Sequence, residues 1–188
     1  MNGFKRISLL CLTTLLLFAF GCSSSASKES TGELVDDSAI TAKVKSEILQ
    51  APTLKMTEIN VETFKGVVQL SGFVGSQAEI ATAAEVAGKV KGVTEVRNDL
   101  LIKEKTTSKN EGAAEYVDST AITAQVKAAF LKDPSLKSAE INVETFKNVV
   151  QLSGFVGSQA EVVNAAALAG SIAGVKSVRN DIRIKGKQ

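Results

Sequence analysis

Few residues in this chain could carry out chemistry. It has no histidine, and its two cysteines are Cys11 and Cys22. Acyl-transfer triads and the common zinc sites depend on histidine or cysteine, so both kinds of site are effectively excluded. The adjacent carboxylates Asp36 and Asp37 could form a metal or acid–base pair, but at the start of an amphipathic segment they favour helix N-capping. We therefore expect no catalytic residue, no metal and no cofactor.

A second motif of possible function is Gly-x-x-Gly, at 72–75 and again at 154–157. It matches the loop of KH nucleic-acid-binding domains, but that loop joins two helices and lies beside basic residues. Here it joins a predicted strand to a predicted helix that begins with Ser76 and carries Glu79. We therefore expect Gly72 and Gly154 to be structural turn glycines.

The first 21 residues have the pattern of a secretory signal peptide. Lys5 and Arg6 precede a 14-residue apolar run, 7–20, which is too short to span a bilayer as a helix. The run ends before Cys22 in a sequence that resembles the lipobox of bacterial lipoproteins, which predicts that Cys22 is acylated. The alternative is an ordinary signal peptide cut near Ala26.

Cysteine and charge agree with an anchored envelope protein. Removal of residues 1–21 leaves Cys22 as the only thiol, with 20 basic and 20 acidic residues. A near-neutral chain argues against nucleic acid as a partner. Ser23 after the cysteine resembles the sorting signal for the outer membrane, which predicts an anchor there with the protein facing the periplasm. Residues 22–35 are rich in serine and are expected to form a flexible tether.

The chain contains one module twice. Residues 58–79 and 140–161 are identical except that Gly66 becomes Asn148, and the match extends without a gap over 36–103 and 118–185. A period this long predicts two domains rather than a solenoid. The polar segment 104–117 is expected to be the linker between them.

Each copy predicts the order α-β-β-α-β, an α+β fold with two helices on one face of a three-stranded sheet. Ile40, Val44 and Ile48 form a helical stripe, and two strands follow around a tight turn at Gly66 or Asn148. A capping box at Ser76-x-x-Glu79, repeated from 158 to 161, starts an alanine-rich helix, and a third strand ends the module.

Two features concern the sheet face that the helices leave uncovered. The face of the last strand that carries Asp99 and Leu101 has Arg183 in place of Leu101 in the second copy, which predicts a solvated face. Four phenylalanines flank the hairpins, and they either line an interface of this face or turn inward at bulges; they are Phe64, Phe73, Phe146 and Phe155.

The two copies resemble the BON domain. The motifs that carry the resemblance are the leading Asp with Ile40 and Val44, the segment GVVQLSGFV at 66–74, and GV-x-x-VRN at 92–98, with counterparts at 148–156 and 174–180. A lipobox followed by two such domains is similar to dual-BON outer-membrane lipoproteins and to osmotically inducible periplasmic BON proteins. The resemblance implies phospholipid binding and envelope maintenance rather than catalysis.

The second copy is the more cationic, with 8 basic and 6 acidic residues against 8 and 9 in the first. The resemblance places membrane contact on its first helix. The expected lipid-binding residues are Lys127, Leu131, Lys132 and Lys137. They would form an apolar tip ringed by lysines, which suits anionic phospholipid. The alternative function is a periplasmic chaperone or accessory factor that binds envelope proteins through exposed sheet faces during outer-membrane assembly.

Overall fold

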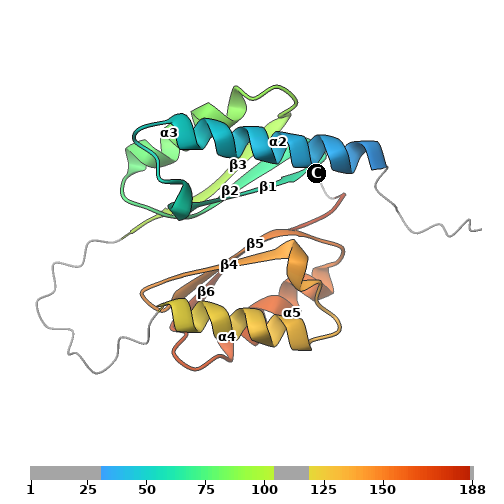
Figure 1. The fold of residues 1–188 in the computed structure, drawn as a ribbon. Coiled ribbons are helices and arrows are strands. Elements are labelled where there is room, and N and C mark those ends of the chain that lie inside the picture. The colour runs from blue at the N-terminus through green and yellow to red at the C-terminus, as the bar shows by residue number, and fades with distance from the viewer. Residues whose placement is uncertain (1–30, 104–118, 187–188) are drawn as a thin grey trace, which may run out of the picture. The chain divides into compact units, whose positions relative to one another are not determined.

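The computed structural model describes residues 31–103 and 119–186, which form two copies of one fold (Figure 1). The predicted signal peptide, Cys22 and the linker 104–117 lie outside the described residues. Module 1 consists of α2 (Thr31–Gln50), η1 (Met56–Glu58), β1 (Ile59–Phe64), β2 (Val67–Val74), α3 (Gln77–Gly88) and β3 (Glu95–Ile102). Module 2 consists of α4 (Ser119–Lys132), η2 (Ser138–Glu140), β4 (Ile141–Phe146), β5 (Val149–Val156), α5 (Gln159–Gly170) and β6 (Ser177–Ile184).

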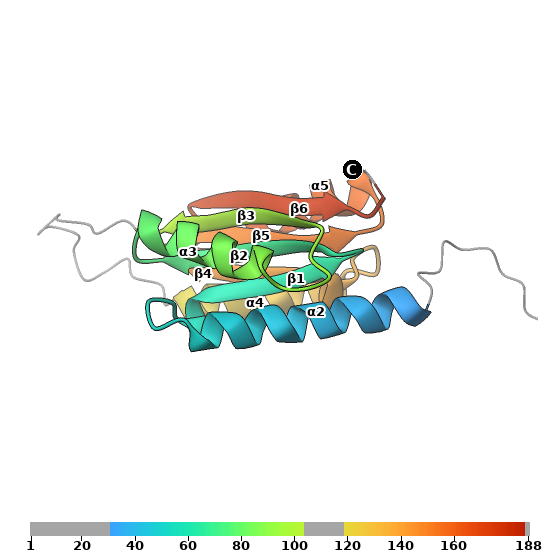
Figure 2. The same cartoon turned by 90° about the horizontal axis from the view of Figure 1, so that it is seen from above.

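Each module has a three-stranded mixed sheet with the hairpin's second strand in the centre. The order is β1-β2-β3, with β1 antiparallel and β3 parallel to β2, and module 2 repeats this order. The parallel pair requires a crossover, which α3 or α5 supplies. Both helices of a module lie on the same face of its sheet (Figure 2). The predicted α+β fold is confirmed.

The core of each module lies between this sheet and its two helices. In module 1 the α2 stripe of Ile40, Val44 and Ile48 packs against the strands, and Val44 and Ile48 are fully buried. Ala83 and Ala87 of α3 are also fully buried, so their small side chains let this helix lie close to the sheet. The predicted capping box is confirmed, because the Ser76 hydroxyl accepts a hydrogen bond from the Glu79 amide at 3.3 Å.

The first helix begins earlier than its sequence predicts. Helix α2 starts at Thr31, inside the predicted tether, so Asp36 and Asp37 lie within it rather than at an N-cap. The Asp37 carboxylate is buried and accepts hydrogen bonds from the amides of Lys65 and Gly66 at 2.7 and 2.8 Å. It therefore fastens α2 to the β1–β2 turn, a long-range role that local spacing did not predict.

The hairpin turns explain the single difference within the repeated segment. Lys65 and Gly66 have φ values of 50° and 76°, and Lys147 and Asn148 have 47° and 65°. Two consecutive positive φ values are typical of the type I′ turn, which favours glycine or asparagine. Asn148 also donates a hydrogen bond from its side chain to the Gly174 carbonyl at 2.6 Å.

Gly72 and Gly154 do not lie in turns, which corrects the prediction made for them. They lie inside β2 and β5, with φ values of 124° and 125°. A Cβ on either glycine would collide with a backbone carbonyl of the preceding segment, that of Glu58 or Glu140. Close strand approach therefore requires glycine at both positions.

The sheet face without helices packs against the other module. The rings of Phe64 and Phe155 are 5.4 Å apart, and those of Phe73 and Phe146 are 5.5 Å apart. This settles the choice left open for the phenylalanines, because they line an interface and do not turn inward. Every residue of β2 is buried as a result.

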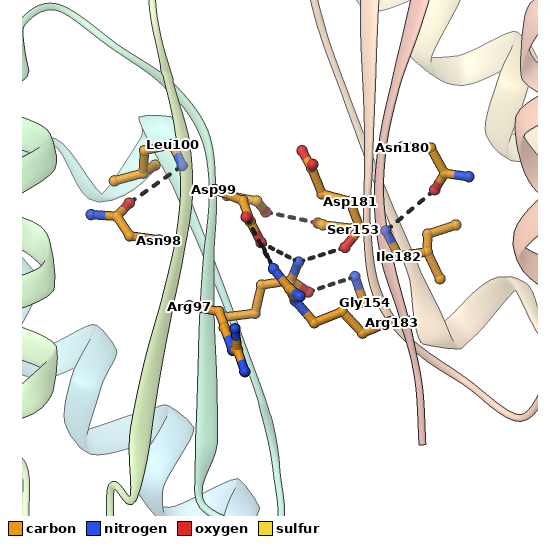
Figure 3. A network of polar contacts seen from close by, with 12 residues as sticks. Arg97, Asn98, Asp99, Leu100, Ser153, Gly154, Asn180, Asp181, Ile182 and Arg183 are labelled. Carbon is orange, nitrogen blue, oxygen red and sulfur yellow. Dashed lines mark hydrogen bonds and ion pairs between the residues drawn. The ribbon is translucent and has the colours of Figure 1, made fainter. Parts of the chain in front are cut away.

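Polar groups in the middle of this interface are paired across it (Figure 3). The Ser71 and Ser153 hydroxyls are 2.7 Å apart. Gln151 accepts from the Gly72 amide at 2.8 Å, and Gln69 accepts from the Gly154 amide at 2.9 Å. Each contact has a counterpart 82 residues away, so the interface resembles that of a two-fold symmetric dimer.

The prediction that the Asp99 and Arg183 face of the last strand is solvated is wrong. Asp99 and Arg183 lie at the interface, where the Arg183 Nη2 donates to both Asp99 carboxylate oxygens at 3.0 and 3.1 Å. The Asp99 side chain is only 14% exposed. Arg183 therefore marks an interface and not a solvated face, because Asp99 of module 1 supplies the opposite charge.

Candidate functional site

Helix α4 carries the surface that the sequence predicts for lipid contact. Its buried stripe is Ile122, Val126 and Phe130, which packs against the module 2 sheet. This stripe fixes the orientation of the helix, so the residues on the opposite side are presented to solvent. Leu131 is on that side and is 74% exposed, more than any other large apolar side chain among the described residues.

Two lysines flank Leu131 on this exposed side. At about 100° per residue, Lys127 lies on one edge of the exposed face and Lys132 on the other. Three exposed alanines complete the apolar strip between them: Ala121, Ala124 and Ala128. Together with Leu131, Lys127 and Lys132 they form what we call the α4 face. The alanines were not among the predicted residues, although their spacing on a helical wheel places them on this side of the helix.

The α4 face has no opposing negative charge on its own helix. Helix α4 contains no acidic residue, and Lys132 lies in its last turn, where a cation interacts favourably with the helix dipole. Lysine stems can lie along an apolar surface while their ammonium groups reach polar head groups. The α4 face therefore has the chemical character of an interfacial, anion-seeking surface.

Lys137 lies apart from this face. It follows the helix at the N-terminal end of η2, and its ammonium is 3.9 Å from the Glu140 carboxylate. Glu140 also pairs with Lys185 at 3.2 Å, so this region carries mixed charge. The structure thus brings Lys127, Leu131 and Lys132 together on one helix and leaves Lys137 outside the group.

The end of α4 is held in place by a short polar cluster. The Ser135 hydroxyl and amide and the Asn164 side chain all donate to Asp133, at 2.7, 2.8 and 3.0 Å. These bonds, led by the Ser135 hydroxyl, hold the pKa of Asp133 below its ordinary value. Val163, the residue before Asn164 in α5, is 60% exposed.

The equivalent helix of module 1 has a different outer face. Leu49 corresponds to Leu131 and is equally open, at 71%. Gln50, Ser46 and Glu47 replace Lys132, Ala128 and Ala129, however. The face of α2 therefore has polar Ser46 and acidic Glu47 in place of alanines, and its lysine on the Lys132 side is Lys43, about two turns earlier than Lys132 in α4.

The described residues contain neither a candidate metal site nor a candidate membrane-spanning helix. Within 31–103 and 119–186 no three side chains of the metal-ligating types gather in one place. No helix in these ranges combines the length and apolar character needed to cross a bilayer.

Comparison with known proteins agrees with the duplicated fold. The family model described as "BON domain" matches residues 36–104 and 118–186. The osmotically-inducible protein Y of Escherichia coli is 43% identical over 160 residues, which cover 85% of this chain and 78% of the relative. The outer membrane lipoprotein DolP of Haemophilus influenzae is 30% identical, with coverage of 79% and 74%. A 21 kDa hemolysin of Actinobacillus pleuropneumoniae is 29% identical, with the same coverage.

Proposed function

Because the chain belongs to the BON-domain family, we propose that it is a non-enzymatic protein of the cell envelope that binds anionic phospholipid through module 2. The observation that carries the proposal is the α4 face, in which exposed Leu131 lies between Lys127 and Lys132 on a helix without acidic residues. Its role is envelope integrity or stress tolerance, in keeping with relatives named for osmotic induction and for the outer membrane.

Binding at this face combines two modest terms. Each lysine near an anionic membrane surface contributes about 1 kcal/mol, and insertion of the exposed Leu131 side chain contributes roughly another 1 to 2 kcal/mol. Their sum corresponds to weak, reversible binding that salt reduces. Such a surface is effective only if something else keeps the protein close to the membrane.

Acylation of Cys22 would supply that proximity. Several acyl chains on the cysteine give a lasting anchor, at about 0.8 kcal/mol per buried CH₂. We place the anchor in the outer membrane, with the modules in the periplasm, because Ser23 follows the cysteine and one relative is an outer membrane lipoprotein. Loss of membrane association in a Cys22→Ala protein expressed with its full signal sequence would test this anchor.

Vesicle flotation tests the proposal without the anchor. We would use the chain made without residues 1–21 and with Cys22→Ser, here called the unacylated chain. It should float with phosphatidylglycerol vesicles at low salt, less at high salt, and not with phosphatidylcholine vesicles. Lys127→Glu with Lys132→Glu should abolish flotation, whereas the charge-matched Lys43→Glu with Lys45→Glu in α2 should not. Equal flotation of all three proteins would contradict the role of the α4 face.

The chaperone alternative is weakened by the module interface. It relied on exposed sheet faces, but Gln69, Ser71, Gln151 and Ser153 on those faces are at most 2% exposed. A client protein could reach them only after the modules separate. We therefore prefer lipid binding, and we regard envelope proteins as partners only for other surfaces of the chain.

A further inference from the structure

A cavity of about 540 Å³ opens at one end of the module interface, well away from the α4 face. This volume lies in the range of sites for small organic ligands. The residues important here come from both modules: Phe64, Lys65 and Arg97 from module 1, and Phe155, Ile182 and Arg183 from module 2. Cations and apolar groups thus line the same space.

One difference between the modules concentrates guanidinium groups at this cavity. Arg183 replaces Leu101 and pairs across the interface with Asp99 at 3.0 Å. In module 2 the corresponding Asp181 is instead paired within its own strand, with Arg179 at 2.9 Å. The module 1 counterpart of Arg179 is Arg97, which lines the cavity. Figure 3 shows Arg97 without a bond to Asp99.

The cations at the cavity retain unused hydrogen-bonding capacity. Arg183 donates to Asp99 only through Nη2, and its Nε is buried without a partner among the described residues. Arg97 pairs at 2.6 Å with Glu95, but both side chains are more than 40% exposed, so the pair is weak and exchangeable. Lys65, Arg97 and Arg183 exceed Glu95 and Asp99 by one positive charge, which favours an anion.

The apolar wall of the cavity favours a ligand that has a hydrocarbon part as well as an anionic group. The centroids of the Phe64 and Phe155 rings are 5.4 Å apart with their planes tilted by 30°, and Val162 and Ile182 extend the apolar surface within module 2. Hydrocarbon placed against this wall would be removed from water, which is favourable at about 25 cal/mol per Å². Charge and wall together match a molecule with one anionic head and one alkyl chain.

We propose that this junction cavity binds a single-chain anionic amphiphile. The head group, a carboxylate or a phosphate, lies between Arg97 and Arg183, and the chain runs along Phe64, Phe155 and Ile182. A free fatty acid and a lysophospholipid share this chemistry. The site takes individual molecules rather than a bilayer surface, and it does not depend on binding at the α4 face.

Titration calorimetry of the unacylated chain tests the proposal, with each ligand kept below its micelle-forming concentration. Dodecanoate represents a fatty acid and dodecyl phosphate a lysophospholipid; dodecyltrimethylammonium is the control of opposite charge. We expect saturable one-to-one binding of at least one anionic ligand, and the preferred head group distinguishes the two sources. Arg183→Leu, which installs the residue that module 1 already has, should weaken binding about tenfold or more.

Two further variants guard against a general loss of folding. Arg97→Gln removes a cation whose partner among the described residues, Glu95, is exposed, and it should weaken binding severalfold with an unchanged circular dichroism spectrum. Arg179→Gln removes the equivalent cation from the opposite end of the interface and should leave binding unchanged. Equal weakening by Arg97→Gln and Arg179→Gln, binding of the cationic ligand, or no saturable binding of either anion would overturn the proposal.

The arginine side chains also give a direct readout. Removal of residues 1–21 leaves three arginines, whose Nε–H groups can be followed by NMR. Ligand should shift the Arg97 and Arg183 signals but not that of Arg179. Vesicle flotation by Arg183→Leu should stay at the wild-type level, so failure of this cavity and failure of the α4 face give different results.

Discussion

The two modules differ least where both faces of the sheet are buried and most where a helix faces solvent. Strands β2 and β5 have the same sequence, and they pack on helices with one face and on the other module with the second. The outer faces of α2 and α4 have no such double constraint. Duplication therefore preserved the strands for structural reasons and left the helices free to acquire different surface chemistry.

The difference between α2 and α4 gives the modules separate roles. Module 1 has the polar outer face and contributes half of the interface. It also has the two hydrogen bonds from the Lys65 and Gly66 amides to Asp37, here called the Asp37 clamp. Module 2 has the apolar, cationic α4 face. The lesson is that an internal repeat supplies its own control, because a residue in one copy can be compared with its counterpart in the same chain.

The largest effect should come from the strand glycines, and it should be the same in both modules. Gly72→Ala or Gly154→Ala places a Cβ against a backbone carbonyl at a positive φ, and we expect a loss of about 3 kcal/mol or more in unfolding free energy. Urea denaturation followed by circular dichroism would measure it. The control is Gly170→Ala, whose nearest neighbour would be at 3.8 Å and which should be nearly neutral.

The interface glutamines come next in expected effect. Gln151→Met leaves the Gly72 amide and the Asp99 carbonyl without their partner, which should cost about 2 to 3 kcal/mol and uncouple the unfolding of the modules. Denaturation curves should change from one transition to two. Gln50→Met, which loses only two local bonds to Ser46 on the exposed α2 surface, should leave a single transition. A single transition in both variants would argue against coupling through this network.

The Asp37 clamp should sharpen the comparison further, because module 2 has Ser119 at that position. Asp37→Ala leaves the Lys65 and Gly66 amides unpaired, and we expect a loss of about 1 to 3 kcal/mol. Exposed Asp36→Ala is the matched control and should change stability by less than about 0.5 kcal/mol. Similar losses from both changes would show that helix electrostatics, and not the clamp, is responsible.

Transfer of vesicle binding to module 1 should have a smaller energetic effect than the stability changes above, but it tests the comparison of α2 with α4 directly. Ser46→Ala, Glu47→Ala and Gln50→Lys give α2 three more outer residues of α4 and leave Lys43 in place of Gln125. Adding one cation and removing one anion should strengthen recruitment to anionic vesicles by roughly 2 kcal/mol at low salt. The test starts from the Lys127→Glu, Lys132→Glu chain, which should regain flotation. No regain would show that a face of this composition is insufficient by itself.

The smallest predicted effect concerns pH. Burial tends to raise the pKa of Glu58, but its hydrogen bond and ion pair with Lys103, helped by Lys55, outweigh this and lower it below 4.5. A lowered folded-state pKa stabilises the protein above pH 4.5, and this contribution is lost as pH falls through the folded pKa. Lys103→Met should reduce stability at pH 7 by less than about 1 kcal/mol and flatten the acid dependence. An unchanged acid slope would contradict this assignment.

Local patterns predicted the fold well because its elements are specified by nearby residues. The stripe of Ile40, Val44 and Ile48, the hairpin turn at Gly66 and the capping box at Ser76 all depend on contacts within a few positions. The predicted packing of two helices on one sheet face followed from these patterns. For the four phenylalanines an interface was one of two alternatives, because they share the strand parity opposite to Ile59, and only the structure decides between them.

The predictions that were wrong concern residues whose structural role depends on contacts with residues far away in the sequence. Asp37 bonds to amides 28 and 29 positions away, and Arg183 bonds to Asp99 84 positions away. No local periodicity contains such pairings. The prediction of turns at Gly72 and Gly154 is wrong because, in sequence, a turn glycine cannot be told from a strand glycine at which a neighbouring carbonyl leaves no room for a side chain. The exposure of Lys127, Leu131 and Lys132 on one side of α4 could be predicted from helical periodicity, and their role in lipid binding stays a prediction. The cavity could not be predicted, because it depends on the three-dimensional pairing of the modules.

A pair of labelled leucines tests the central claim most directly. Leu49 and Leu131 are equivalent, similarly exposed positions, and the unacylated chain contains no other cysteine once either is changed to cysteine. With a polarity-sensitive dye attached and phosphatidylglycerol vesicles added, the emission of Leu131→Cys should shift to shorter wavelength and that of Leu49→Cys should stay constant. Equal shifts at both positions, or no shift at position 131, would contradict membrane contact through α4.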